Sequence, residues 1–424
     1  MSHIDVKGLT KVFGNHPERG VELARQGKSK DEILAETGQV LAVNDVSFDV
    51  DQGEMFVVMG LSGSGKSTVI RMLNRLIEPT SGTVDLDGER ISDMSMSRLR
   101  EVRAQKMSMV FQHFALFPHR TVGDNAAYGL KIQGVDEAER RERAEGALAR
   151  VGLSGWFDRY PSEMSGGMKQ RVGIARGLAT DADILLMDEP FSALDPLIRR
   201  DMQDLLMELQ AELSRTVVFI THDLNEAMRI GDRIVVMKDG AVVQVGTGEE
   251  IIHDPATTYV ADFVADVDRS RVLTASLAMH EPSATFGPDA TPREVLDHLD
   301  TSERNGVYVV DDDNRVLGVA RDQEMAAAMQ ANAPTIRDHL VDAYATASPD
   351  TLLDDLSAIA ARHTVSIAVI DDEGHLLGTV PRPALLRALA GDRRMDATRG
   401  SDGPARDQVE APSEDATTSR EVPA

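Results

Sequence analysis

The sequence predicts an α/β domain followed by a smaller α+β region. Two observations support this fold class. In the first two thirds of the chain, short continuous apolar runs alternate with long helical patterns, which is typical of a parallel sheet covered by helices. In the last third, one strand–turn–strand–helix pattern occurs twice. With 424 residues and about 100 to 200 residues per domain, the chain has room for two to four domains.

Four apolar runs predict strands that are buried on both faces, at residues 55–59, 184–187, 217–220 and 234–237. The segment 40–50 precedes the first run and alternates apolar with polar residues, as a half-buried strand does. Helical patterns such as residues 197–213 separate the runs. In such α/β domains, ligands bind at the carboxyl ends of the strands.

Residues 113–176 interrupt this alternation, because their pattern is mostly helical, with a charged helix expected over 137–151. We therefore expect a helical subdomain at about 113–176, inserted in a first domain that covers residues 1–276.

The repeat in the last third has an offset of 60 residues, both from Asp311 to Asp371 and from Gly318 to Gly378. Each copy predicts two strands joined by an acidic turn and then a helix, at 322–331 and at 383–390. Neither copy is long enough to bury a core alone, so we expect a paired module with copies at 277–332 and 333–390. Residues 391–424 contain almost no large apolar side chain, which predicts a disordered acidic tail.

The composition excludes several functions. Seventy acidic against 45 basic residues give a net charge of −25 and argue against non-specific binding of nucleic acid or of an anionic lipid surface. The absence of cysteine excludes disulfides and thiolate chemistry. The N-terminus lacks the apolar core of a signal peptide, and no apolar run reaches 18 residues. A cytoplasmic chain that does not itself span a membrane is therefore expected.

The strongest motif follows the predicted strand 55–59 and opens a helical pattern, as a phosphate-binding loop does. It fits G-x-x-x-x-G-K-[ST] with Gly60, Leu61, Ser62, Gly63, Ser64, Gly65, Lys66 and Ser67. The glycines let backbone N–H groups surround a phosphate, and the helix N-terminus adds partial positive charge. Lys66 would contact the outer phosphates, and Ser67 would offer its hydroxyl to Mg²⁺.

The phosphate loop alone does not distinguish a kinase, a GTPase and a transport ATPase, but a second site does. The predicted strand 184–187 ends in Asp188 and Glu189. Asp188 would hold Mg²⁺ through its coordinated water, and Glu189 is placed to activate the attacking water. Residues 165–170 form a small-residue turn that opens another helix, a second place for a phosphate. Two such places in one chain imply that ATP is sandwiched between two chains.

Together these residues resemble the ATP-binding-cassette (ABC) transporter ATPases, which have a P-loop NTPase fold and use ATP and Mg²⁺. The resemblance implies that Gln112 contacts Mg²⁺ and the attacking water, and that His222 contacts the γ-phosphate. It further implies that Asp195 belongs to the loop between the two nucleotide sites. The expected catalytic residues are then Glu189, His222 and Gln112. The residues expected to bind the nucleotide are those named above together with Thr68, Ser165, Gly166, Gly167 and Gln170. Ser67, Gln112 and Asp188 would hold Mg²⁺.

In the family an aromatic ring stacks on adenine, and Phe13 matches its position. The polar stretch 16–38 departs from the general ABC pattern, because it separates Phe13 from the next strand. A place for Phe13 in the core therefore stays open as an alternative.

The stretch 16–38 and the sequences 57–68, 73–80 and 191–199 resemble the ATP-binding subunit of glycine betaine/L-proline importers. The 60-residue repeat is similar to the tandem CBS (cystathionine-β-synthase) module of that subfamily. The resemblance implies that the chain pairs with a second copy of itself and that a membrane permease docks on its helical subdomain. It also implies a periplasmic or lipid-anchored binding protein that is coupled indirectly. The chain would then lie on the cytoplasmic face of the membrane.

Other functions remain as alternatives. A non-transport ABC ATPase in DNA repair or translation usually fuses two cores or carries coiled-coil arms, and this sequence has neither. A binding protein in which the ATPase is inactive and the repeats carry the function is disfavoured, because no catalytic position is missing. Choline, carnitine or another amine or amino acid remains an alternative cargo, since other subunits recognise it.

The charge is unevenly distributed, because residues 277–424 hold 13 basic and 27 acidic side chains and no lysine. This acidic excess has two interpretations. One is a solvated surface in a salt-adapted organism, and the other is a module that senses ionic strength. A further expectation for the module is an adenine nucleotide between its CBS copies.

Overall fold

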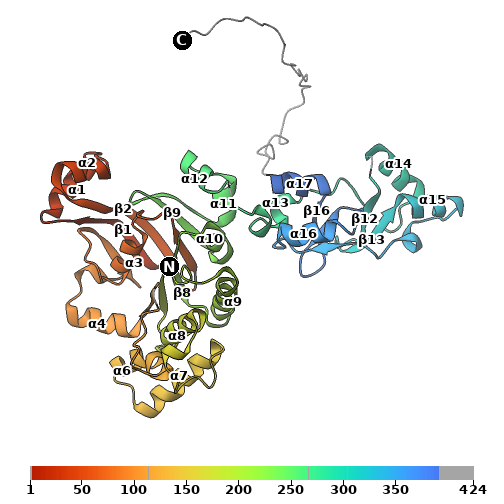
Figure 1. The fold of residues 1–424 in the computed structure, drawn as a ribbon. Coiled ribbons are helices and arrows are strands. Elements are labelled where there is room, and N and C mark those ends of the chain that lie inside the picture. The colour runs from red at the N-terminus through yellow and green to blue at the C-terminus, as the bar shows by residue number, and fades with distance from the viewer. Residues whose placement is uncertain (1, 113, 266, 303, 391–424) are drawn as a thin grey trace, which may run out of the picture. The chain divides into compact units, whose positions relative to one another are not determined.

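The computed structural model describes residues 2–112, 114–265, 267–302 and 304–390 (Figure 1). The chain divides into two compact units. The first contains Met1–Thr274 together with Asp350–Asp355, and the second contains the rest of the chain from Ala275 on. The tail predicted at 391–424 lies outside the described residues.

A six-stranded sheet forms the centre of the first unit, in the order β10-β9-β3-β8-β7-β6. Its strands are β3 (Met55–Met59), β6 (Met107–Val110), β7 (Ile184–Asp188), β8 (Thr216–Thr221), β9 (Arg233–Lys238) and β10 (Ala241–Gly246). The first five are parallel and β10 is antiparallel at the edge. Every residue of β3, β7 and β8 is buried, so the four strands predicted from continuous apolar runs are confirmed.

A second, antiparallel sheet has the order β2-β1-β4-β5. It consists of β1 (Ser2–Phe13), β2 (Val40–Asp51), β4 (Ser81–Leu86) and β5 (Glu89–Arg90). Burial alternates along most of β2, as its sequence predicts for a strand with one face on the core. One apolar cluster joins the two sheets, with members such as Ile4, Val50, Phe56 and Val218.

Helices cover the six-stranded sheet and connect its strands, as expected of an α/β unit. They are α3 (Lys66–Leu73), α4 (Met96–Gln105), α9 (Pro196–Leu213) and α10 (Leu224–Ile230), followed by α11 (Gly248–His253) and α12 (Thr258–Phe263). Asp195 caps α9, whose bounds confirm the predicted helix 197–213. Among the described parts of the chain, no helix combines the length and apolar character that crossing a bilayer requires.

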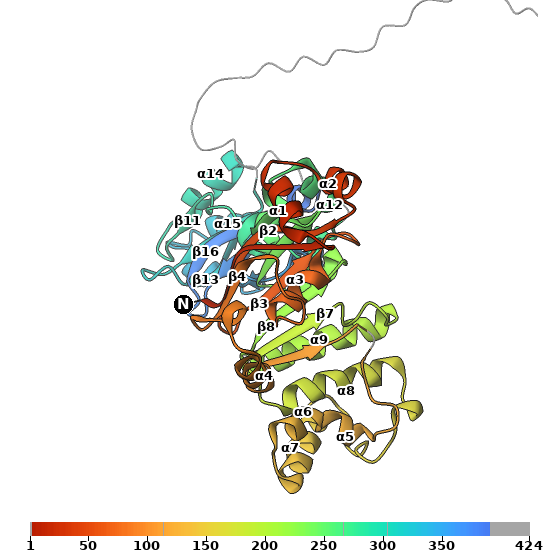
Figure 2. The same ribbon diagram turned by 90° about the vertical axis from the view of Figure 1, so that its left-hand side faces the viewer.

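The helical subdomain is drawn in yellow-orange to yellow-green in Figure 2 and lies beside the β6 end of the sheet. It contains α5 (Val122–Ala126), α6 (Tyr128–Gln133), α7 (Glu137–Arg150) and α8 (Gly166–Ala179). The predicted helix 137–151 is confirmed as α7. The helices pack through small residues: a Cβ on Gly123 would lie 2.4 Å from the Phe157 ring.

The stretch 16–38, which the sequence identified only as polar, folds into two helices, α1 (Pro17–Arg25) and α2 (Lys30–Thr37). Their few apolar side chains are buried against β1 and β2 in a cluster of Val12, Val21, Leu23, Ile33 and Leu41. The stretch therefore forms a small helical hairpin that covers the end of the β1–β2 pair (Figure 1).

The second unit repeats one fold. The first copy has β11 (Thr285–Phe286), β12 (Gly306–Val310), β13 (Val316–Arg321), α14 (Pro292–Ser302) and α15 (Asp322–Gln330). The second has β14 (Thr346–Ala347), β15 (Ile367–Ile370), β16 (Leu376–Val380), α16 (Leu353–Ala360) and α17 (Arg382–Ala390), and a short α13 (Ala275–Ala278) precedes both. In each copy a parallel strand pair precedes an antiparallel hairpin.

The two acidic turns have the same conformation. The carboxylates of Asp311 and Asp371 each accept hydrogen bonds from the backbone N–H groups two and four residues later. The copies also pack together, because the Tyr308 hydroxyl donates to the Ser366 carbonyl at 2.6 Å and Asn314 donates to the Leu376 carbonyl at 2.8 Å. The paired organisation expected from the 60-residue offset is confirmed.

Candidate nucleotide-binding and catalytic site

The phosphate loop lies between β3 and α3, and its glycines are required by close backbone approach. Gly65 has φ = 98°, and a Cβ there would lie 2.4 Å from the Ala42 carbonyl oxygen of β2. A Cβ on Gly60 would lie 2.3 Å from the Met237 carbonyl oxygen of β9. Any larger residue would therefore push the loop away from the two strands that hold it.

Lys66 is almost completely buried beneath this loop. Its Nζ donates to the carbonyls of Gly60 at 2.8 Å and Leu61 at 3.1 Å, and lies 3.9 Å from Oε1 of Glu189. Burial lowers the pKa of the Lys66 ammonium, while the carboxylates of Glu189 and Asp188 oppose that shift. The ammonium thus bonds neutral carbonyls close to where the loop would hold a phosphate.

Asp188, at the end of β7, is 2% exposed and lies beside the first turn of α3. Its Oδ1 accepts a hydrogen bond from the Ser67 hydroxyl at 2.8 Å, and its Oδ2 one from Arg71 at 3.0 Å. Arg71 was missed from the sequence, although it follows Ser67 by four residues and so lies on the same face of the helix.

Glu189 forms the centre of the catalytic candidates. Its Oε2 lies 3.4 Å from the Gln112 amide nitrogen and 3.1 Å from Nδ1 of His222. The three come from the ends of β7, β6 and β8, neighbours in the parallel sheet. The structure therefore brings together the three residues that the sequence placed in catalysis.

The backbone of Glu189 is in the left-handed region, with φ = 45°. Its N–H donates to the Ile220 carbonyl at 3.1 Å, and its carbonyl accepts from the Ser192 hydroxyl at 3.0 Å. Ser192 also accepts from the Gln112 amide at 3.2 Å. A non-glycine residue in this conformation needs such support, and its presence at an enzyme site is a recognised sign of function.

The predicted second phosphate site lies at the N-terminus of α8, which Ser165 caps by accepting from the Met168 N–H at 3.3 Å. Ser165 and Gly166 are exposed, while Gly167 packs so tightly that a Cβ would lie 2.5 Å from Ile198. The start of α8 therefore lies at the surface, while the Met168 N–H of its first turn is used by the cap.

Gln170 differs from the expectation. Its side chain is fully buried, and neither amide atom has a hydrogen-bond partner within the described residues. A side chain inside the packing of α8 does not contact a nucleotide at the surface in this conformation, so Gln170 is separated from Ser165 and Gly166. The helical period explains the difference, because Gln170 lies on the face of α8 that packs inward.

The structure also places four further residues of the predicted site. Asp195 accepts from the Ile198 N–H at 3.1 Å, so its carboxylate serves as the N-cap of α9 in this conformation. Thr68 lies in the first turn of α3, and its N–H donates to the Gly65 carbonyl at 3.0 Å. Ser62 and Gly63 are at the tip of the phosphate loop, where a Cβ on Gly63 would meet nothing.

Phe13 is 42% exposed at the end of β1, so the alternative that it belongs to the core is wrong. It pairs across the strands with Val40, which is 41% exposed. The Lys11 ammonium lies 5.0 Å from the centre of the ring. Paired residues of adjacent strands share one face, so Phe13 and Val40 form an open apolar platform.

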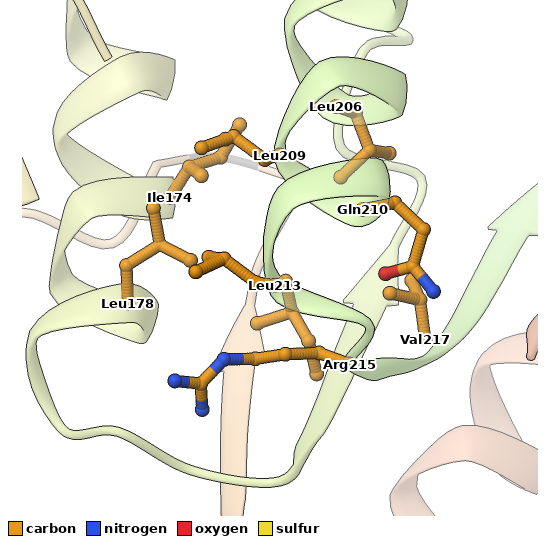
Figure 3. A pocket seen from close by; sticks show the side chains of 9 residues that line it. Ile174, Leu178, Leu206, Leu209, Gln210, Leu213, Arg215 and Val217 are labelled. Atoms are coloured by element: carbon orange, nitrogen blue, oxygen red, sulfur yellow. The ribbon is translucent and has the colours of Figure 1, made fainter. Parts of the chain in front are cut away.

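A separate apolar pocket lies between α8 and α9 (Figure 3). It is lined mainly by leucine and isoleucine side chains, with Gln210 and Arg215 at its edge. None of the predicted site residues lines it, and the Arg215 guanidinium instead donates to the Ala182 carbonyl. The pocket therefore has no part in the site built around Glu189.

The chain is similar to known proteins over most of its length. The family model described as "ABC transporter" matches residues 43–192, and the model described as "CBS domain" matches 273–331 and 336–391. The chain is 48% identical to the glycine betaine transport ATP-binding protein OpuAA of Bacillus subtilis over 94% of this chain and 95% of that protein. It is 49% identical to the glycine betaine/carnitine transport ATP-binding protein GbuA of Listeria monocytogenes over 92% of this chain and 98% of that protein.

Among solved structures, the chain resembles the dimeric post-hydrolysis state of the ATP-binding cassette MJ0796 bound to ADP and Pi. The TM-score is 0.50 at 32% identity, and the match covers 58% of this chain and 98% of the other. The fold of the first unit is thus that of an ATP-binding cassette. With a second unit that matches CBS domains twice, the chain belongs to the ABC transporter family, among the ATP-binding proteins of the glycine betaine transport group.

Proposed function

We propose that this chain hydrolyses ATP to energise the import of glycine betaine, proline and related osmoprotectants through a membrane permease. The observation that carries the proposal is the convergence of Gln112 and His222 on one carboxylate oxygen of Glu189, beside a phosphate loop. The relatives named for glycine betaine and carnitine transport support the class of cargo.

The donor set around Asp188 fits Mg²⁺, which prefers oxygen ligands and is usually held by one or two carboxylates plus phosphate oxygens. A buried carboxylate bonded to a serine hydroxyl at 2.8 Å offers such a set. Ser67, Asp188 and Gln112 would hold the ion. When bound, it would neutralise charge on the outer phosphates of ATP.

The residues of this chain would act as follows. The phosphate loop and Lys66 hold the phosphates, and the Gln112 amide and the His222 imidazole fix Glu189 and the water that it activates. Glu189 accepts a proton from that water as the water oxygen attacks the γ-phosphorus, and the bond from this phosphorus to the β,γ-bridging oxygen breaks to release ADP. Phe13 supplies a face on which adenine stacks.

One copy is incomplete, because the donors of Ser165, Gly166 and Gly167 would meet the ATP held by a partner. We therefore infer a dimer with two ATP molecules between its subunits, attached through the helical subdomain to the permease on the cytoplasmic face of the membrane. A periplasmic or lipid-anchored binding protein would deliver the cargo. Closure on ATP and opening after hydrolysis would drive alternating access in the permease.

Purification of the full chain with its permease, followed by transport of labelled glycine betaine, choline, proline and carnitine, tests the cargo. ATP-dependent uptake of glycine betaine supports the proposal. Uptake of only another amine or amino acid would assign that compound as the cargo. ATP hydrolysis without any coupled uptake would contradict the transport function.

The second unit would regulate the ATPase, with CBS copies at 277–332 and 333–390. Its acidic surface makes ionic strength the first variable to change, since salt screens exposed charges over about 10 Å at 0.1 M. A chain ending at residue 276, compared with the full chain over a series of KCl concentrations, tests this. Unchanged salt dependence of transport would count against sensing by this unit.

A further inference from the structure

The α1–α2 hairpin is fixed on the β1–β2 pair by several independent contacts. Gly20 of α1 packs so closely on β1 that a Cβ would lie 2.7 Å from Val12. Gln39, almost fully buried, donates from its side chain to the His16 carbonyl at 2.7 Å. Ser29 and Glu32 form a capping box at the start of α2. Because these contacts hold both ends, the hairpin has a defined place beside the strand that borders the phosphate loop.

From that place the hairpin contacts the phosphate loop. The Lys30 ammonium, on the first residue of α2, donates to the Gly63 carbonyl at 3.2 Å. Two other cations of the hairpin are paired within it, since Arg19 and Lys28 both lie beside the carboxylate of Glu36. Within the described residues, Lys30 has no carboxylate at ion-pair distance. Its charge is therefore directed at the loop and is not neutralised locally.

The position of this hydrogen bond matters for phosphate binding. In a phosphate loop the backbone N–H groups point inward and the carbonyls point outward. The Gly63 carbonyl and the Ser64 N–H belong to one planar peptide and point in opposite directions. The carbonyl bonds Lys30, while the N–H donates to the Leu61 carbonyl inside the loop at 3.2 Å. Both sides of this peptide are therefore held, and the Lys30 ammonium helps to fix the turn at the tip of the loop.

We infer that the α1–α2 hairpin is an accessory element of the ATP site and that Lys30 is a positioning residue for the phosphate loop. This inference rests on the proposed ATP site. Lys30 would hold the Gly63–Ser64 peptide in place at the tip of the loop, and so keep the shape of the loop, and would add positive charge beside it. We expect it to affect ATP affinity, because its hydrogen bond is to the phosphate loop and it makes no contact with Glu189, Gln112 or His222 among the described residues.

The test compares Lys30→Met with Lys28→Met in the full chain. Methionine keeps most of the apolar stem of the lysine and removes the charged, hydrogen-bonding ammonium. The matched control lies on the same hairpin but pairs with Glu36 and not with the loop. Lys30→Met is expected to raise the Kd and KM for ATP about three- to tenfold with kcat within about twofold, as loss of one charge-assisted hydrogen bond does. Lys28→Met should leave all three constants near those of the original chain.

Lys30→Arg is expected to restore most of the affinity, because its guanidinium also reaches a carbonyl with a positive charge. Equal KM values for Lys30→Met and the original chain would overturn the inference. Equal losses of affinity, kcat and Tm in both methionine variants would also overturn it, because they would show that the hairpin acts only as packing. ATP binding in a Lys66→Ala variant reports separately on the proposed site: if that variant binds ATP normally, the site itself is wrong.

Discussion

The Nδ1 atom of His222 lies 3.1 Å from the Oε2 atom of Glu189, and the Gln112 amide approaches the same oxygen. Two side chains from the ends of separate strands therefore share one carboxylate oxygen of Glu189, and the second oxygen of Glu189 faces the Lys66 ammonium at 3.9 Å. Glu189 is held from both sides, as expected of a group that must accept a proton from one particular water.

Glu189→Gln tests the general base. The amide has nearly the same shape, so ATP binding should persist, but it cannot accept the proton. We expect the ATPase rate to fall by about 10²-fold or more, as loss of a general base does. The measurement is kcat for the complex with its permease, alongside Kd for ATP. Glu208→Gln, on the exposed face of α9, is the matched control. Turnover near the original value would contradict the assignment.

Ser67→Ala tests the metal ligands. Removing the hydroxyl leaves Asp188 with its Arg71 partner but takes away one oxygen of the expected Mg²⁺ set. The Mg²⁺ concentration for half-maximal hydrolysis should rise about tenfold or more, which is a typical effect of weakening a metal site. Chelation of Mg²⁺ by EDTA should stop hydrolysis in both proteins. Ser97→Ala, on the exposed part of α4, should leave the Mg²⁺ requirement unchanged.

Phe13→Ala tests the adenine platform. Stacking of a base on an aromatic ring is worth about 1–3 kcal/mol, so the Kd for ATP should rise about fivefold or more. Calorimetric titration with ATP and with tripolyphosphate, which lacks the base, separates stacking from phosphate binding. Phe13→Trp should keep the affinity for ATP. An equal loss for tripolyphosphate would mean that Phe13 supports the strand end and does not stack on adenine.

The buried carboxyl of Glu226 should make the stability of the folded chain depend on pH. Its side chain is 5% exposed, and burial raises the pKa of this carboxyl above its ordinary value of 4.5, although hydrogen bonds from Thr221 and Gln203 oppose the shift. As pH rises, the folded chain therefore keeps this proton up to a higher pH than the unfolded chain does. The stability contributed by the protonated group is complete below the ordinary pKa and is lost as pH rises through the raised pKa.

Glu226→Gln removes that titration and leaves an amide that can still accept from Gln203. The drop in Tm of the original chain as the pH rises above about 4.5 should therefore be smaller in this variant, by an amount that linkage sets. Thermal unfolding followed by circular dichroism measures it, with Glu208→Gln as control. An identical drop in all three proteins would show that Glu226 does not contribute.

The sequence determined the strands and most of the chemistry of the site. Continuous apolar runs predicted β3, β7, β8 and β9 because a strand buried on both faces leaves no polar position. The fixed spacing of the phosphate loop identified Lys66 and Ser67, since backbone N–H groups close on a phosphate only with glycines at those places. The 60-residue offset gave the paired fold of the second unit.

Tertiary structure alone decided three things. The convergence on Glu189 joins residues 33 or more positions apart, and only the order of β6, β7 and β8 brings their ends together. The burial of Gln170 depends on which face of α8 packs inward, which the motif does not encode. The polar stretch 16–38 folds into a hairpin because its few apolar side chains pack against β1 and β2. That packing placed Lys30 on the Gly63 carbonyl, a contact that arises only when distant segments of the chain are folded together.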